Sequence, residues 1–258
     1  MKKIIFLLFL ALFFYINNIT QAQDNDLDDF TFDDEEIEAK SDYFTMGVGI
    51  TGNLLFMKYD DLNSKFLTPK NIDNFSGPMF PLGYEIFFTF IDNARIGFTY
   101  QTDSKLKELI SNNEELVSIK NTAKLSNSMF GLSFSYALIP FESFAIVPSL
   151  GVNLGDMTFD NFTSPTSVEY DSKETTIYEN TQINYSYLAI EPQLNLEYAI
   201  TKFLMLRAGV SYVLTLDSPF VKNAWSINGN NVYLNVPDGL KPQGLNVKLG
   251  LFVGLFNY

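Results

Sequence analysis

Bulky apolar residues alternate with small or polar residues in eight stretches of the chain, and this period of two predicts β-strands. The stretches cover residues 43–51, 81–91, 94–101, 126–138, 144–155, 185–198, 204–215 and 245–256. Short turns at 92–93, 140–142 and 200–202 alternate with long connections near 59–80, 103–125, 157–181 and 218–243. All long loops then lie on one side of the sheet, which is typical of an antiparallel up-and-down barrel. Pro148 and Pro192 each delete a ladder donor, so we expect bulges there.

The alternation alone leaves open which face of the barrel is inside. A soluble eight-stranded barrel buries its apolar face, but the interior of so small a barrel is only wide enough for side chains to fill it. The small and polar set suits that lumen, and it lacks the density of charge that a water-facing wall needs. About ten residues per strand, tilted near 40°, also give a band about 25 Å tall. We therefore predict an all-β, eight-stranded antiparallel transmembrane β-barrel over residues 43–258, with four long extracellular loops and short periplasmic turns.

The first residues predict a secretory signal peptide over 1–22. Lys2 and Lys3 precede an unbroken apolar run over 4–16, and Ala22 ends a short polar patch suited to cleavage. The alternative is a membrane anchor, but this run rises only about 20 Å as a helix, which is too short to span. No later segment is apolar enough for a transmembrane helix. The chain has no cysteine, so disulfides and a lipidated N-terminus are excluded.

An acidic segment follows over residues 23–42, with ten acidic residues against the single Lys40. Like charges repel one another, so we expect a disordered periplasmic tail. Loose binding of a cation or of a periplasmic partner is an alternative. A calcium loop is another, because four acidic residues fall at positions 1, 3, 5 and 12 of such a loop, although Asp29 stands where the loop needs glycine. These four residues are Asp24, Asp26, Asp28 and Glu35.

The net charge of −13 excludes a nucleic-acid-binding role, because such a chain repels phosphate. We expect no metal and no cofactor. The chain also has no histidine, the side chain best suited to proton transfer near neutral pH. We therefore expect that the protein is not an enzyme.

The pattern of strands, together with the aromatic Tyr258 at the end, resembles the small eight-stranded outer-membrane barrels of Gram-negative bacteria. These include the transmembrane domain of outer-membrane protein A, its X-type relatives and the barrel domains of Bacteroidetes. The resemblance covers 43–258 and implies an integral protein of the cell outer membrane. It also implies that the barrel-assembly machinery recognises the C-terminal aromatic residue. Here Tyr258 shares the register of the lumen residues, so its outward placement needs a bulge or fraying.

Six charged residues are predicted to face the lumen. Three are acids and three are bases, and a charge in a narrow, poorly hydrated lumen must find a partner. They are Glu85, Arg95, Glu191, Glu197, Arg207 and Lys248. Glu197 and Arg207 flank the turn at 200–202 and should lie opposite each other. We expect a structural network of ion pairs that plugs the barrel; the alternative is a gate whose pairs exchange to open a small pore.

Five aromatic residues share the lumen register, and we expect them to fill space. They are Phe87, Tyr185, Tyr187, Phe252 and Phe256. The alternative is a mouth for a hydrophobic solute. The sequence thus favours a monomeric, porin-like cell-surface protein in contact with outer-membrane lipid, with a structural or surface-interaction role through its long loops. The alternative role is a small gated pore or channel for ions or hydrophobic solutes.

Overall fold

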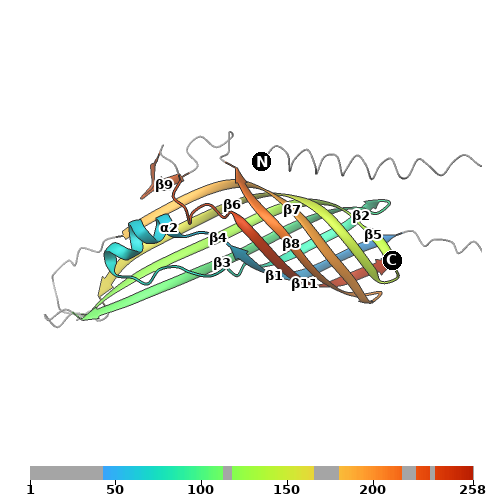
Figure 1. Cartoon of the computed structure of the whole chain (residues 1–258), viewed down its shortest axis with the longest axis horizontal. Helices are drawn as coiled ribbons and strands as arrows, with labels where there is room; N and C mark the ends of the chain where they lie inside the picture. Colours follow the sequence, from blue (N-terminus) through green and yellow to red (C-terminus); the bar gives the residue numbers. More distant parts are fainter. Residues whose placement is uncertain (1–42, 113–117, 166–179, 217–224, 233–235, 258) are drawn as a thin grey trace, which may run out of the picture. The chain divides into compact units, whose positions relative to one another are not determined.

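The computed structural model describes residues 43–112, 118–165, 180–216, 225–232 and 236–257 of the chain. Eight antiparallel strands each pair with the next, and the last pairs with the first, so the sheet closes into a barrel (Figure 1). These strands are β1 (Phe44–Phe56), β2 (Leu82–Ile91), β3 (Ala94–Asn112), β4 (Ser118–Tyr136), β6 (Phe144–Pro165), β7 (Asn180–Thr201), β8 (Leu204–Leu216) and β11 (Gly244–Asn257). The predicted fold is confirmed. The predicted signal peptide, the acidic tail and Tyr258 lie outside the described residues.

The outer wall of the barrel is apolar, as the alternation predicted. Along β1, for example, Val48 and Ile50 are 55% and 59% exposed, whereas Thr45 and Thr51 on the same strand face inward and are buried. The same alternation continues around the barrel through β11, where Val253 is 60% exposed and Phe252 is buried. So large an exposed apolar surface is unfavourable in water and favourable against lipid. The wall faces lipid.

Three short turns connect strands at one end of the barrel, at Asp92–Asn93, Glu142–Ser143 and Lys202–Phe203. Asn93 has a positive φ of 62°, a conformation that asparagine tolerates better than most residues. The second turn begins later than predicted, because residues 138–141 form the short strand β5 (Leu138–Phe141), which folds back onto β6. Both described ends of the barrel chain lie at this end, which we call the turn end.

The expected bulges at the two prolines are wrong. Pro148 pairs with Leu194 and Pro192 pairs with Leu150, within one uninterrupted register between β6 and β7. Between β7 and β8 the ladder is interrupted opposite Pro192 and resumes in the same register at Gln193. Each proline therefore interrupts the strand pairing with one of its two neighbouring strands, and neither inserts the extra residue that defines a bulge.

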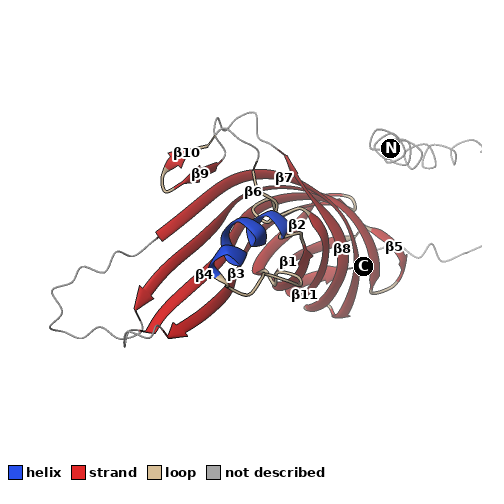
Figure 2. Ribbon diagram, turned by 60° about the vertical axis from the view of Figure 1, so that its left-hand side comes forward, coloured by secondary structure: helices blue, strands red, loops and turns tan. Residues whose placement is uncertain are grey.

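The predicted loops at 103–125 and 157–181 are also largely wrong. β3 and β4 stay paired from Ala94 to Asn112, and β6 and β7 stay paired out to Phe162. These four strands project beyond the rim formed by the other four, at the end opposite the turns, which we call the loop end (Figure 2). These strands were not predicted because the apolar and polar faces exchange sides there. Apolar residues such as Met157 and Phe159 face inward, and the polar Asp156 faces outward.

Two further segments cover the loop end. Residues 60–70 form a compact helical segment, made of α2 (Asp60–Leu62), a π-helical turn (Asn63–Leu67) and a 3-10 turn (Thr68–Lys70). It lies over the inner face of the projecting strands (Figure 2). A small hairpin of β9 (Trp225–Ile227) and β10 (Asn230–Asn231) pairs with the free edge of β7. Among the described residues, no helix is long and apolar enough to cross a membrane.

Candidate functional site

The lumen near the turn end is organised around the buried carboxylate of Glu197. Arg95 binds it through both ends of its guanidinium group, with Nη1 and Nη2 each 2.8 Å from a carboxylate oxygen. Arg207, opposite Glu197 in the ladder, donates from Nε to the same carboxylate at 2.7 Å. Tyr43 accepts a hydrogen bond from Arg95 at 3.2 Å. Each of these three hydrogen bonds to Glu197 comes from a charged guanidinium group, and the carboxylate is fully buried.

Both guanidinium groups of this cluster lie close to the ring of Phe87. Arg95 and Arg207 each place their central carbon 4.7 Å from the ring centroid, and Arg207 lies 4.3 Å from the ring of Phe252 as well. Arg207 also pairs with Glu85. Cations over aromatic faces are stabilised most where water is excluded. The aromatic residues thus stabilise both arginines that bind Glu197.

A second polar layer, further from the turns, is built on Glu191. Its carboxylate accepts from Lys248 at 2.7 Å, from Ser211 at 2.6 Å, and from the amides of Asn246 and Asn153 at 3.1 and 2.8 Å. These donors come from three different strands, β6, β8 and β11. All six lumen charges proposed from the sequence are therefore brought together in two groups, and in each group every acid has a basic partner.

The proposed lumen aromatics divide between the two ends. Phe87, Phe252 and Phe256 pack together near the turns, with Phe87 and Phe252 5.3 Å apart at their centroids. Tyr185 and Tyr187 belong to a larger cluster at the loop end, where the Tyr187 hydroxyl donates to Asn127 at 2.8 Å. All five are buried.

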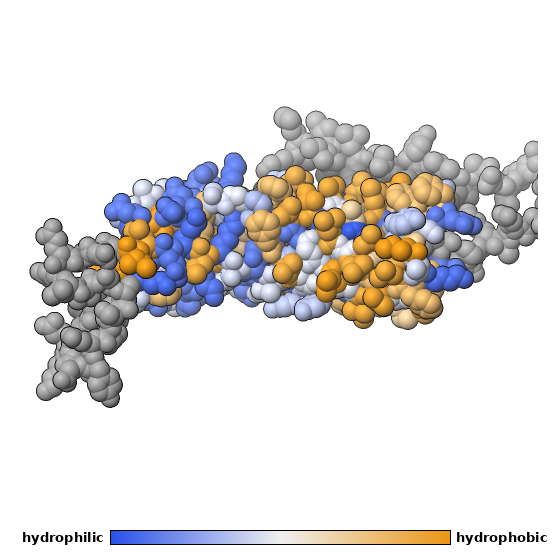
Figure 3. Space-filling view, turned by 90° about the horizontal axis from the view of Figure 1, so that it is seen from below, coloured by the Kyte–Doolittle hydropathy of each residue, from blue (hydrophilic) through white to orange (hydrophobic). Residues whose placement is uncertain are grey.

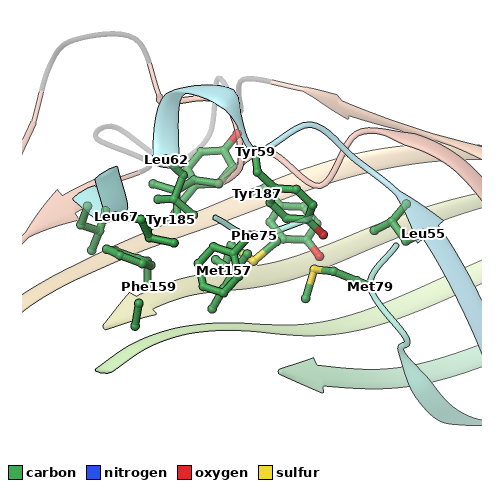
Figure 4. Packing of buried hydrophobic residues seen from close by; sticks show 14 of the residues in the cluster. Leu55, Tyr59, Leu62, Leu67, Phe75, Met79, Met157, Phe159, Tyr185 and Tyr187 are labelled. Carbon is green, nitrogen blue, oxygen red and sulfur yellow. The ribbon is translucent and has the colours of Figure 1, made fainter. Parts of the chain in front are cut away.

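Sequence reasoning missed the residues that close the loop end. The helical segment and the chain that follows it place six apolar side chains against the inner faces of the projecting strands (Figure 4). These are Tyr59, Leu62, Leu67, Ile72, Phe75 and Met79, each at most 5% exposed. We call residues 57–81 the plug. The spacing of Tyr59, Leu62 and Phe66, which matches one face of a helix, was a usable signal inside the predicted loop.

Polar contacts fasten the plug to the wall. The Lys105 ammonium of β3 donates to the carbonyls of Ser76 and Gly77 at 2.7 and 2.9 Å. Burial lowers the pKa of Lys105. On the opposite side, Asn161 of β6 donates to the carbonyl of Phe66 at 3.2 Å. The plug is thus held from two sides of the projecting sheet.

The described residues contain no group of acidic, histidine or cysteine side chains that could hold a metal ion. The calcium-loop candidates Asp24, Asp26, Asp28 and Glu35 lie outside the described residues. One hollow in the described part of the chain, of about 770 Å³, lies along the apolar outer wall across residues such as Ile50 and Leu249, and another, of about 370 Å³, lies among the turns.

No protein-family model matches this chain, and no curated protein matches it by sequence. Solved structures that resemble it are bacterial outer-membrane proteins. The attachment invasion locus protein Ail of Yersinia pestis is 11% identical and aligns over 83% of this chain and 98% of its own, with a TM-score of 0.36. A major outer membrane protein from Thermus thermophilus is 10% identical over 81% and 99% of the two chains, with a TM-score of 0.45.

The outer membrane protease OmpT of Escherichia coli also resembles the chain, at 11% identity over 83% of this chain and 95% of its own, with a TM-score of 0.33. Enzymes therefore occur among the similar structures. At these values the resemblance adds nothing to the argument from the wall and the strand order. Closure, strand number, short turns at one end and an apolar outer wall together make this chain an outer-membrane-type transmembrane β-barrel in contact with lipid.

Proposed function

We propose that this protein is a closed outer-membrane barrel that anchors a folded, projecting end at the cell surface, where that end interacts with its surroundings. The observation that carries this proposal is the set of packed and paired side chains along the lumen. Near the turns these are the Glu197 cluster and the cluster of Phe87, Phe252 and Phe256, and farther toward the loop end they are the Glu191 cluster and the plug. The role of the six charged residues in this account is structural.

The filled lumen argues against the alternative of a pore for ions or apolar solutes. An ion entering the Glu197 layer would have to displace arginines that hold that carboxylate with three short hydrogen bonds. Removing one member of a buried ion pair typically costs about 3–5 kcal/mol. An apolar solute would first have to displace the plug, and would then meet two charged layers.

An enzymatic role is also disfavoured. The chain has no histidine, and the buried carboxylates of Glu191 and Glu197 have both oxygens occupied by donors within the barrel. Both groups are also buried, so a substrate outside the barrel does not reach them. We further propose that the chain is a monomer, that the barrel-assembly machinery inserts it, and that the acidic segment 23–42 is a periplasmic tail after removal of residues 1–22.

Planar-bilayer recording tests whether the barrel is closed. The purified full-length protein, refolded into lipid, should give no unitary currents under conditions in which a general porin conducts. Reproducible unitary currents from the wild type would refute the closed barrel.

Surface labelling tests the orientation of the projecting end. Since the chain has no cysteine, Asp160→Cys at the loop end and Lys202→Cys in a turn each introduce one thiol. A membrane-impermeant maleimide added to intact cells should label Asp160→Cys and leave Lys202→Cys unlabelled until the cells are broken. The reverse pattern would show that the turns face outward.

A further inference from the structure

The outward faces of the four projecting strands carry a patch of mostly polar side chains, many of them short. Strand pairing aligns these residues in three rows of four, one residue from each of β3, β4, β6 and β7. The rows are Thr102–Ser128–Asp156–Ser186, Ser104–Ser126–Thr158–Asn184 and Leu106–Lys124–Asp160–Gln182. We call these twelve residues the polar grid. At the usual strand spacing the grid measures about 14 Å across the strands and about 13 Å along them.

The grid begins where the lipid-facing wall ends. The next row toward the turns is Tyr100–Phe130–Leu154–Leu188, in which Tyr100, Phe130 and Leu154 are 49%, 51% and 59% exposed. The change of polarity is visible on the surface, where the orange band gives way to blue toward the loop end (Figure 3). A lipid whose acyl chains lie against this last apolar row therefore brings its headgroup onto the grid.

The grid is ordered and rich in both donors and acceptors. Thr158 donates to the side-chain oxygen of Asn184 at 3.1 Å, and Ser186 donates to Asp156. The contact with Thr158 uses the side-chain oxygen of Asn184 and not its amide nitrogen. Short side chains such as serine and threonine lose less conformational entropy on binding than lysine or glutamate does. The exposed face of the plug carries two lysines, Lys65 and Lys70, whereas the grid carries one, Lys124.

We infer that the polar grid binds the neutral, hydroxyl-rich sugar headgroup of a glycolipid in the same leaflet of the membrane. Sugar hydroxyls donate and accept hydrogen bonds, so they match the mixture of hydroxyls, amides and carboxylates in the grid. An anionic headgroup fits less well, because two carboxylates, Asp156 and Asp160, outnumber the single Lys124. This inference builds on the proposed function, because it names the partner of the projecting end.

Lipid retention in mixed vesicles tests the inference. The full-length protein is refolded into phosphatidylcholine vesicles that also contain digalactosyldiacylglycerol and phosphatidylglycerol with the same acyl chains. After mild extraction, mass spectrometry gives the ratio of the two minor lipids that remain with the protein. The wild type should retain the neutral glycolipid in preference. The double variant Thr158→Val with Asn184→Leu should lower that ratio about tenfold, because it removes about two hydrogen bonds.

A matched control comes from the same strands outside the grid. Ser164→Val with Asn180→Leu changes the same kinds of groups on the outward faces of β6 and β7, farther from the membrane, and should retain the glycolipid like the wild type. The folded barrel's altered mobility on unheated gels verifies that each variant is folded. Equal ratios in the wild type and the grid variant would overturn the inference.

Two other outcomes would also overturn it. Preference for phosphatidylglycerol would mean that the grid takes an anionic headgroup, and displacement of the glycolipid by free digalactose at comparable concentration would mean that it takes a soluble glycan. Lipid retention and conductance are separate measurements. A wild-type protein that conducts in planar bilayers would refute the closed barrel whatever lipid it retains, and a silent protein without glycolipid preference would refute only the binding by the grid.

Discussion

Removing the carboxylate of Glu197 should strongly destabilise the barrel, because this one carboxylate binds two arginines. Glu197→Ala removes the two hydrogen bonds from Arg95 to this carboxylate and one of the two carboxylates that hold Arg207, which keeps Glu85. Arg95, Arg207 and Glu197 are 2%, 7% and 0% exposed, so water cannot replace the lost partner. Breaking such a buried pair by removing one member typically costs about 3–5 kcal/mol, so we expect a loss of unfolding free energy in this range.

Glu85→Ala is the matched comparison. It also removes one carboxylate from Arg207, but Arg207 keeps its hydrogen bond from Nε to Glu197 at 2.7 Å. We expect it to lower the free energy of unfolding by the value of one hydrogen bond to a charged group, about 1.5–3 kcal/mol. The loss should lie at the lower end of this range because Glu85 is more accessible than Glu191 and Glu197. Glu197→Ala should therefore be the more destabilising of the two.

Urea titration of the refolded protein in lipid vesicles measures both free energies of unfolding, with barrel mobility on unheated gels as the readout of folding. A third variant, Glu197→Ala with Arg95→Met, removes the stranded charge together with its partner and should recover part of the loss. The reasoning fails if Glu197→Ala unfolds within about 0.5 kcal/mol of the wild type, which is the range of ordinary surface substitutions.

Three further substitutions probe other parts of the molecule. Gly244→Ala should cost at least about 1–3 kcal/mol in urea titration, because Gly244 has a φ of 153° and a Cβ there would lie 1.8 Å from the Phe56 carbonyl oxygen; wild-type stability would contradict this. Leu62→Ala should cost about 2–5 kcal/mol of local stability by leaving a cavity in the plug, and limited proteolysis should then cut the plug before the barrel; an unchanged cleavage pattern would argue against a packed plug. Leu251→Lys should destabilise the barrel in lipid by about 2–4 kcal/mol, whereas Thr158→Lys in the polar grid should change little; equal effects would place the edge of the lipid band elsewhere.

The sequence was sufficient for those features that depend on local alternation. Strand identity, the outward direction of residues such as Val48 and the pairing of Glu197 with Arg207 all follow from a period of two and a short turn. The contact between Arg95 and Glu197 does not follow in the same way. It joins β3 to β7 across the lumen, and it depends on how the closed barrel sets the two strands against each other.

The plug and the projecting strands could not be found by the rule that found the barrel. That rule takes bulky apolar residues as outward facing, and it holds only where lipid surrounds the wall. Beyond the lipid band the outer face meets water, so Met157 and Phe159 turn inward and need a cover. The plug is that cover: the ring of Phe66 packs tilted against Phe159 and the ring of Phe75 packs edge-on against it, at centroid distances of 5.4 and 6.4 Å. To predict this end of the barrel, the apolar residues of the plug and the reversed faces of the projecting strands would have to be recognised together.

The reversal of polarity also fixes how deep the barrel sits in the membrane. If the barrel shifted through the membrane by two residues in the direction of its turn end, Asp156 of β6 would enter the hydrocarbon layer. If it shifted by the same amount in the other direction, Leu154 and its row would be exposed to water. A charged side chain on the lipid face costs up to about 2–4 kcal/mol at the midplane and less near the interface. The boundary between apolar and polar residues lies at the same row on all four projecting strands. The small free-energy costs of shifting each strand therefore add up and keep the barrel at one depth in the membrane. A barrel fixed in this way keeps the polar grid at the level of the headgroups, where a glycolipid sugar would meet it.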